Sequence, residues 1–159
     1  MGADAPQAIQ DQISGNHCFG CGPRNEGGLQ IKSYWTGDNQ TTVRFEPQKH
    51  QCAGPADLVN GGIIATVIDC HGVCTAMAHA YRLEGRTIGS DPKLWFVTGS
   101  LQVSYKAPTP IATPFDVVAE VTEWAEKKTI VRCELISGEQ VCATGEIIAV
   151  RVPASLYNG

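Results

Sequence analysis

Residues 58–80, LVNGGIIATVIDCHGVCTAMAHA, constrain the fold more than any other part of the chain. From Gly61 onward they are almost wholly apolar or small, and at 100° per residue the apolar side chains surround the helix on all sides. Such a pattern is typical of a helix buried inside a protein. A membrane span would need roughly 18 or more consecutive apolar residues, whereas Asp69, His71 and His79 interrupt this run. We therefore expect a long core helix, around which the remaining chain is wrapped.

Asp69 is the one carboxylate in this stretch, and on a helix it shares its side with small residues, namely Gly62, Ala65, Gly72 and Ala76. A buried carboxylate costs free energy unless it is paired or hydrogen-bonded. Burial also raises the pKa of such a group, as is common for acids and bases in functional sites. Asp69 is therefore a candidate functional group, and the alternative is a structural Asp satisfied by a buried hydroxyl or water.

The predicted start of the helix offers hydrogen-bond donors. Asn60 is a favourable N-cap residue, and Gly61 and Gly62 let another group approach the free amides, which can stabilise a developing oxyanion. Asp69 lies eight residues beyond Gly61, or about 12 Å along the helix axis. One helix cannot bring both groups to one carbonyl, so a shared reaction predicts two antiparallel copies of the helix in a homodimer with two symmetric sites.

Length and charge limit the class of protein. A chain of 159 residues, 43% apolar and 18% charged, is typical of one soluble globular domain. A net charge of -4 without a Lys/Arg run argues against nucleic acid as a general partner. The N-terminus shows neither a secretory signal nor a lipid-anchor motif. We expect a cytoplasmic protein that does not bind membranes.

Seven cysteines, an odd number, are expected as free thiols in a reducing cytoplasm. Cys18 and Cys21 have the spacing of metal ligands, and His50 with Cys52 could complete a Cys3His zinc site. A second CxxC motif is missing. A packed, loop-closing role is therefore the preferred interpretation, with no metal and no other cofactor.

The rest of the chain is expected to form strands. Alternating patterns predict a hairpin over residues 29–36 and 41–45 and four further strands over 94–106, 114–124, 129–137 and 139–152. The short breaks between the last four favour an antiparallel meander. We expect an α+β domain in which about six antiparallel strands curl around the helix. Residues 1–28 would form an N-terminal arm and a Gly/Cys loop, residues 29–152 the domain, and residues 153–159 a tail.

Simple alternation also divides the side chains of the strand at 94–105 between two faces. Trp95, Val97, Leu101, Val103 and Tyr105 occupy the apolar one. Thr98 falls on the opposite, polar-lined face, where it would be available to a ligand.

Three segments together resemble a known family, the hotdog-fold acyl-CoA thioesterases, in the branch of the phenylacetate-pathway (PaaI-like) and C-terminal-modulator-like enzymes. They are CFGCGPRNEGGLQI, NGGIIATVID and VTGSLQVSYKAPTP, within a resemblance that covers residues 19–150. The resemblance implies a hydrolase acting on an acyl- or aroyl-CoA thioester, as a homodimer or a dimer of dimers (a homotetramer).

The resemblance also implies roles for individual residues. Asp69 would activate water or attack the thioester carbonyl, and the N–H of Gly61, alone or together with that of Gly62, would polarise that carbonyl from the other subunit. Thr98 matches a position whose hydroxyl orients the water or the carboxylate. Asn60 stands where the family commonly has His, and an amide can donate a hydrogen bond but cannot take a proton.

Other polar residues are weaker candidates. His71 points to nearly the opposite side of the helix from Asp69, which predicts a core or interface histidine. Arg82, Arg86 and Lys93 after the helix, with Lys106 at the end of the following strand, could bind the phosphates of coenzyme A. Solvated loop charges explain them equally well.

Cys70 and Cys74 have the character of buried, inert helix cysteines.

Three functions stay open. Thioester hydrolysis leads, a non-catalytic acyl-CoA-binding domain is the alternative because of Asn60, and a dehydratase is weaker because no His stands at the helix start.

Overall fold

The computed structural model describes residues 5–157, which form one long α-helix, six strands and three short 3-10 turns. The helix is α1 (Gly61–Leu83), and the strands are β1 (Tyr34–Trp35), β2 (Gln40–Phe45), β3 (Trp95–Tyr105), β4 (Phe115–Trp124), β5 (Lys128–Ser137) and β6 (Gln140–Val152). The turns are η1 (Gln10–Gln12), η2 (Lys49–Gln51) and η3 (Ala154–Tyr157). Residues 1–4 of the expected arm and 158–159 of the expected tail lie outside the described residues.

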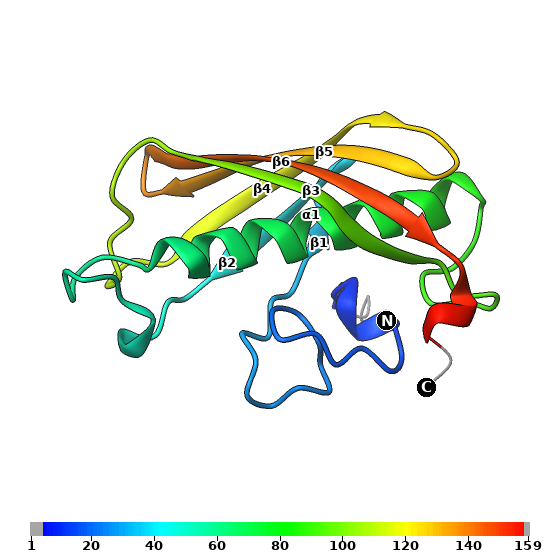
Figure 1. Cartoon of the computed structure of the whole chain (residues 1–159), viewed down its shortest axis with the longest axis horizontal. Coiled ribbons are helices and arrows are strands. Elements are labelled where there is room, and N and C mark those ends of the chain that lie inside the picture. The colour runs from blue at the N-terminus through cyan, green and yellow to red at the C-terminus, as the bar shows by residue number, and fades with distance from the viewer. Residues whose placement is uncertain (1–4, 158–159) are drawn as a thin grey trace.

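The six strands form a single antiparallel sheet in the order β1-β2-β4-β5-β6-β3. The predicted meander is correct for β4, β5 and β6 but wrong for β3, which pairs with β6 and not with β4. Residues 106–114 make this possible, because nine extended residues reach about 30 Å. Three strand spacings amount to only about 15 Å. The link therefore carries the chain past the ends of β6 and β5, and β3 becomes an edge strand (Figure 1).

The helix α1 lies along the concave side of this sheet, with Ile64, Val67 and Ile68 buried in the core (Figure 1). It extends to Leu83, beyond the end of the apolar stretch at residue 80. By length and composition alone α1 could cross a membrane, but 61% of its most apolar window is buried inside the protein. Its apolar character is therefore explained by its place in the core.

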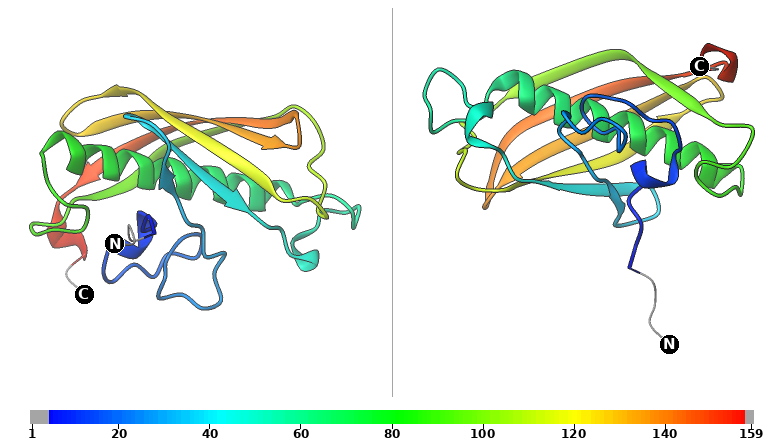
Figure 2. Two further views of the ribbon diagram at one scale, coloured as in Figure 1. Left: turned by 180° about the vertical axis from the view of Figure 1, so that it is seen from behind. Right: turned by 90° about the horizontal axis from the view of Figure 1, so that it is seen from below.

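Residues 5–33 cover the side of α1 that faces away from the sheet (Figure 2). The predicted first hairpin strand is much shorter than expected, since only Tyr34–Trp35 pairs with β2. The preceding residues pair elsewhere, as Leu29 N–H donates to Phe19 O and Ile31 N–H to Gly20 O. The helix thus lies between the sheet and an N-terminal loop, and the α+β hotdog arrangement expected from the sequence is confirmed.

Candidate active site

The start of α1 is capped as predicted. Asn60 Oδ1 accepts hydrogen bonds from the N–H groups of Gly62 (2.7 Å) and Ile63 (3.4 Å). The Gly62 N–H is therefore engaged inside the chain, while within residues 5–157 the Gly61 N–H has no acceptor. Since Asn60 Oδ1 faces the helix, its Nδ2 is left as a second donor at this exposed terminus. Two donors thus remain at the helix start, one from the backbone and one from a side chain.

Tyr105 supports this helix start, and sequence reasoning did not assign it a role. Its hydroxyl donates a 2.6 Å hydrogen bond to Gly61 O and ties the end of β3 to the first residue of α1. The only sequence signal was its place in the segment VTGSLQVSYKAPTP. Tyr105 thereby holds the peptide on the C-terminal side of Gly61 in place.

Asp69 lies two turns further along α1 and is half-buried. Thr98 Oγ1 donates a 2.7 Å hydrogen bond to its Oδ1, and within residues 5–157 its Oδ2 has no partner. Burial raises the pKa of Asp69 above its usual range, the Thr98 hydroxyl opposes this, and the nearby Cys21 adds to the rise. The result is an oriented carboxylate with one oxygen free to accept a proton or to attack a carbonyl.

A β-bulge places Thr98 beside Asp69. The register of β3 against β6 shifts between Thr98 and Ser100, so that Gly99 is the extra residue. Thr98 pairs with Ala149 and Leu101 with Ile147, and both of these partners are fully buried on the helix side of β6. The expectation that Thr98 lies on the face opposite Leu101 was therefore wrong, because the bulge reverses the alternation within the strand.

A cavity of about 570 Å³ opens beside Asp69 and Thr98. Its walls are mostly apolar and come from α1, β3 and the N-terminal loop; they include Val73, Met77, Trp95, Phe96, Val97, Asn16, His17 and Cys18. A carboxylate at the edge of an apolar cavity suits a ligand with a polar reacting group and an apolar tail.

A second cavity, of about 720 Å³, lies at the start of α1 and is lined by Asn60, Ile63, Phe19 and Phe45, among others. Asp69 does not line this cavity, and Asn60 does not line the first. One chain therefore keeps Asn60 and the Asp69 carboxylate in separate cavities, and Gly61 and Asp69 lie about 12 Å apart along α1.

The structure does not bring the predicted phosphate-binding arginines to Asp69. Arg82 lies 13 residues beyond Asp69, or about 20 Å along the helix. Its guanidinium donates to Gly37 O (3.2 Å) and Asp38 O (2.6 Å) and stacks 3.5 Å above the Trp35 ring. It therefore holds the β1–β2 turn.

Arg86 has internal partners as well. It donates to Ser90 O (2.8 Å) and Pro92 O and pairs with Glu84 (2.7 Å). Lys106, which follows β3 directly, is exposed at the end of the molecule that holds the helix start. A role for these three residues in binding phosphate stays a prediction.

His71 is a core histidine, as predicted. It is fully buried, with Nδ1 2.7 Å from Ser33 Oγ and Nε2 3.3 Å from Thr41 Oγ1. Burial lowers the pKa of His71 to about 4, so the ring is neutral near pH 7. Both ring nitrogens are engaged away from Asp69, which excludes an Asp69–His71 dyad within one chain.

The structure does not bring together the Cys3His zinc ligands that the sequence spacing suggested. Among the described residues, Cys18 and Cys21 gather with Cys70 of α1, whereas His50 and Cys52 line the second cavity. The Cys3His combination is therefore not formed.

No protein-family model and no curated protein matches the sequence. Among solved structures, a thioesterase superfamily protein from Shewanella loihica is 37% identical over 77% of this chain and 91% of its own, with a TM-score of 0.62.

Two further structures show the fold alone. The PaaI protein of the Escherichia coli phenylacetic acid degradation operon is 12% identical, with a TM-score of 0.64 over 79% of this chain and 81% of its own. A thioesterase from Haemophilus influenzae is 9% identical, with a TM-score of 0.65 over 82% of this chain and 84% of its own.

A buried helix inside a six-stranded antiparallel sheet, with a carboxylate beside an apolar cavity, defines a hotdog-fold protein of the thioesterase type. The identity and coverage of the Shewanella structure then give the family, and the chain belongs to the thioesterase superfamily.

Proposed function

We propose that the protein hydrolyses an acyl- or aroyl-CoA thioester to the free acid and CoA, with Asp69 as general base or nucleophile. The observation that carries this proposal is the hydrogen bond from Thr98 to Asp69 at the edge of the apolar cavity, which leaves Oδ2 free. Membership of the thioesterase superfamily supports the reaction class.

In the base mechanism, Asp69 Oδ2 takes a proton from water while the water oxygen bonds to the thioester carbonyl carbon. The carbonyl oxygen becomes an oxyanion. Its collapse breaks the C–S bond, and the proton held by Asp69 passes to the departing thiolate. The thiolate is a good leaving group, so the step requires a positioned base and oxyanion donors, with no metal in the chemical step.

The oxyanion donors are the Gly61 N–H and Asn60 Nδ2 of the partner subunit. The Gly62 N–H, considered from the sequence, is a poorer candidate because it already donates to Asn60 Oδ1. Tyr105, by donating to Gly61 O, anchors the residue that carries the proposed donor N–H. Each well-placed donor contributes on the order of 10²-fold or more in rate.

The exposed edge of the sheet supports a homodimer. β3 ends the sheet next to Asp69, and its side chains Leu101 and Tyr105 are 37% and 54% exposed in the single chain. An unpaired edge with large exposed apolar side chains is a natural pairing surface. Antiparallel packing of two such chains would place the α1 start of one beside Asp69 of the other, in a dimer or a dimer of dimers.

Thiol release from short, long and aromatic acyl-CoAs tests the proposal, with wild type and Asp69→Asn compared. We expect release by wild type and a loss of about 10²-fold or more in kcat/KM in the variant, the scale of a positioned base. Glu126→Gln is a matched control, because it also neutralises an acidic group but lies exposed in the turn between β4 and β5.

Circular dichroism and thermal unfolding would show that Asp69→Asn is folded. Unchanged release by folded Asp69→Asn would remove Asp69 from the mechanism. Binding of acyl-CoA without release from any substrate would favour the alternative function, a non-catalytic acyl-CoA-binding domain, for which Asn60 in place of His is the specific reason.

A further inference from the structure

Four of the seven cysteines meet at one point between the N-terminal loop and α1. Cys18 Sγ lies 3.6 Å from Cys70 Sγ, and Cys21 Sγ lies 3.7 Å from Cys74 Sγ. The ligand atoms of Cys18, Cys21 and Cys70 all lie within 4.8 Å of one another. A CxxC pair in the loop thus faces a CxxxC pair on one side of the helix.

These separations fit a tetrahedral metal site. Zn–S bonds of about 2.3 Å in a tetrahedron place the sulfur atoms about 3.8 Å apart. The observed 3.6 and 3.7 Å are close to that edge and far longer than a disulfide bond of about 2.05 Å. Cys18, Cys21 and Cys70 are therefore spaced as three ligands of one ion, and Cys74, in contact with Cys21 Sγ, is the neighbouring fourth sulfur. Four thiolates in a tetrahedron bind Zn²⁺ or iron among common metal ions.

The loop is folded tightly around these sulfur atoms. The Gly22 N–H donates to Cys18 O (2.8 Å), which closes the turn that carries Cys18 and Cys21. A Cβ on Gly20 would lie 2.2 Å from Cys70 Sγ, and one on Gly22 would lie 2.3 Å from Cys18 N. Gly20 is therefore required for the loop backbone to approach Cys70, and Gly22 for the turn that carries Cys18 and Cys21.

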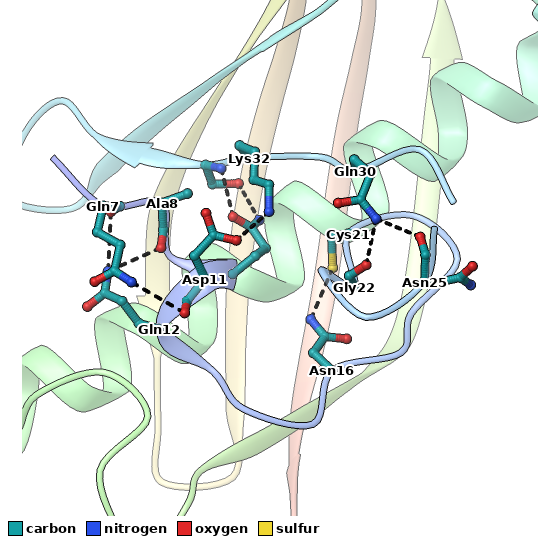
Figure 3. Close-up of polar contacts among 12 residues, drawn as sticks. Gln7, Ala8, Asp11, Gln12, Asn16, Cys21, Gly22, Asn25, Gln30 and Lys32 are labelled. Carbon is teal, nitrogen blue, oxygen red and sulfur yellow. Dashed lines mark hydrogen bonds and ion pairs between the residues drawn. The ribbon is translucent and has the colours of Figure 1, made fainter. Parts of the chain in front are cut away.

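The surroundings also favour thiolate at this point. Asn16 Nδ2 donates to Cys21 Sγ at 3.7 Å (Figure 3). A cation bound among the four sulfur atoms would stabilise all of them as thiolates.

We propose that Cys18, Cys21, Cys70 and Cys74 bind a structural Zn²⁺ ion that fastens the N-terminal loop to α1. Four cysteine ligands close the coordination sphere, so the ion has no open position for substrate. Its role is architectural: Asn16, His17 and Cys18 form one wall of the cavity beside Asp69, and the ion holds that wall against the helix.

Metal analysis of the full-length protein tests the proposal independently of any activity. Protein produced with added zinc and purified under reducing conditions should contain about one Zn²⁺ per chain. Replacement by Co²⁺ should give the strong visible absorption of tetrahedral thiolate-bound cobalt. Cys70→Ser should lose both signals, whereas Cys52→Ser and Cys142→Ser, which alter cysteines outside the cluster, should keep them.

Chemical labelling tests the same site without a mutation that could prevent folding. Cys18 is the exposed cysteine of the cluster, so a free Cys18 thiol would react readily with an alkylating reagent. Bound to zinc, it should be protected until a strong chelator is added. Cys52 is half-exposed and outside the cluster, so peptide mass spectrometry should find it labelled equally with and without the chelator.

Three results would overturn the proposal. They are protein with no bound zinc that also gives no cobalt spectrum, iron in place of zinc, and rapid labelling of Cys18 before chelation. Metal that survives Cys70→Ser in a folded protein would show that the ion lies elsewhere.

Discussion

The Thr98 hydroxyl affects the pKa of Asp69 as well as the orientation of its carboxylate. Burial raises the pKa of Asp69, and the hydrogen bond from Thr98 stabilises the carboxylate and lowers that pKa. Thr98→Val keeps the shape but removes the donor, so the pKa should rise further. Because the proposed reaction needs the carboxylate, the acid limb of kcat/KM should move to higher pH in Thr98→Val, as a pH–rate profile would show.

Thr98→Ser is the matched control for this prediction, because it keeps the hydroxyl. Its acid limb should stay with wild type. An unchanged acid limb in Thr98→Val, or an equal shift in both variants, would show that the hydroxyl does not set the pKa of Asp69.

The sequence predicted the positions of some residues and missed the contacts of others. The cap by Asn60 and the core position of His71 follow from local pattern, and the structure confirms both. The Cys18–Cys70 contact spans 52 residues, and a helical projection does not show which loop will cover a given side. The pairing of a CxxC with a CxxxC on the predicted helix was the available signal, and it was missed because each pair was interpreted alone.

At the scale of elements, a glycine sets the distance between α1 and the sheet. A Cβ on Gly72 would lie 2.6 Å from Ile147 Cδ1 and 2.9 Å from its Cγ1, both in the core of β6. Gly72→Ala should therefore destabilise the protein by about 1–3 kcal/mol through overpacking, despite the better helix propensity of Ala. Urea unfolding of the purified protein measures this change.

Ile147→Val removes Cδ1, the atom nearest to the new Cβ, and therefore tests whether overpacking against Ile147 destabilises Gly72→Ala. Alone it should cost about 0.5–1.5 kcal/mol. Combined with Gly72→Ala it should cost less than the sum, because one change relieves the other. Strict additivity of the two free energies of unfolding would show that Gly72 does not set this contact.

The boundaries of β2 to β6 were predicted well, whereas those of β1 and the order of the strands in the sheet were not. β4, β5 and β6 follow from alternation and tight turns, which are local properties. The pairing of β3 with β6 joins segments distant in the chain and depends on how the sheet closes around α1. Gly99 inside the strand was a signal for a bulge. A prediction that included this bulge would have placed Thr98 on the helix side of the sheet.

At the scale of the whole molecule, the proposed site is incomplete in one chain. α1 carries the Gly61 N–H and Asp69 about 12 Å apart, and Asn60 and Asp69 line two separate cavities. A pair of inactive variants can therefore test whether the two groups act across a dimer. Asp69→Asn removes the base, and Gly61→Pro removes the free N–H.

Gly61→Pro is suited to this use because Gly61 is the first residue of α1, where proline fits a helix. Asn60 before it already has φ -61 and ψ 135, which a following proline favours. The Gly61 carbonyl and its bond from Tyr105 are retained. Each variant alone should lose most of its thioesterase activity while staying folded.

Co-expressed with two different tags, the two variants should form heterodimers with one intact site, built from Gly61 of one chain and Asp69 of the other. Random pairing of equal amounts makes half the dimers mixed, each with one of its two sites intact, so about a quarter of wild-type activity should return. The doubly tagged fraction should carry all of it. If both groups served the same chain's reaction, every site would lack one group and no mixture would recover activity, so complementation separates a site shared between subunits from one contained in a single chain.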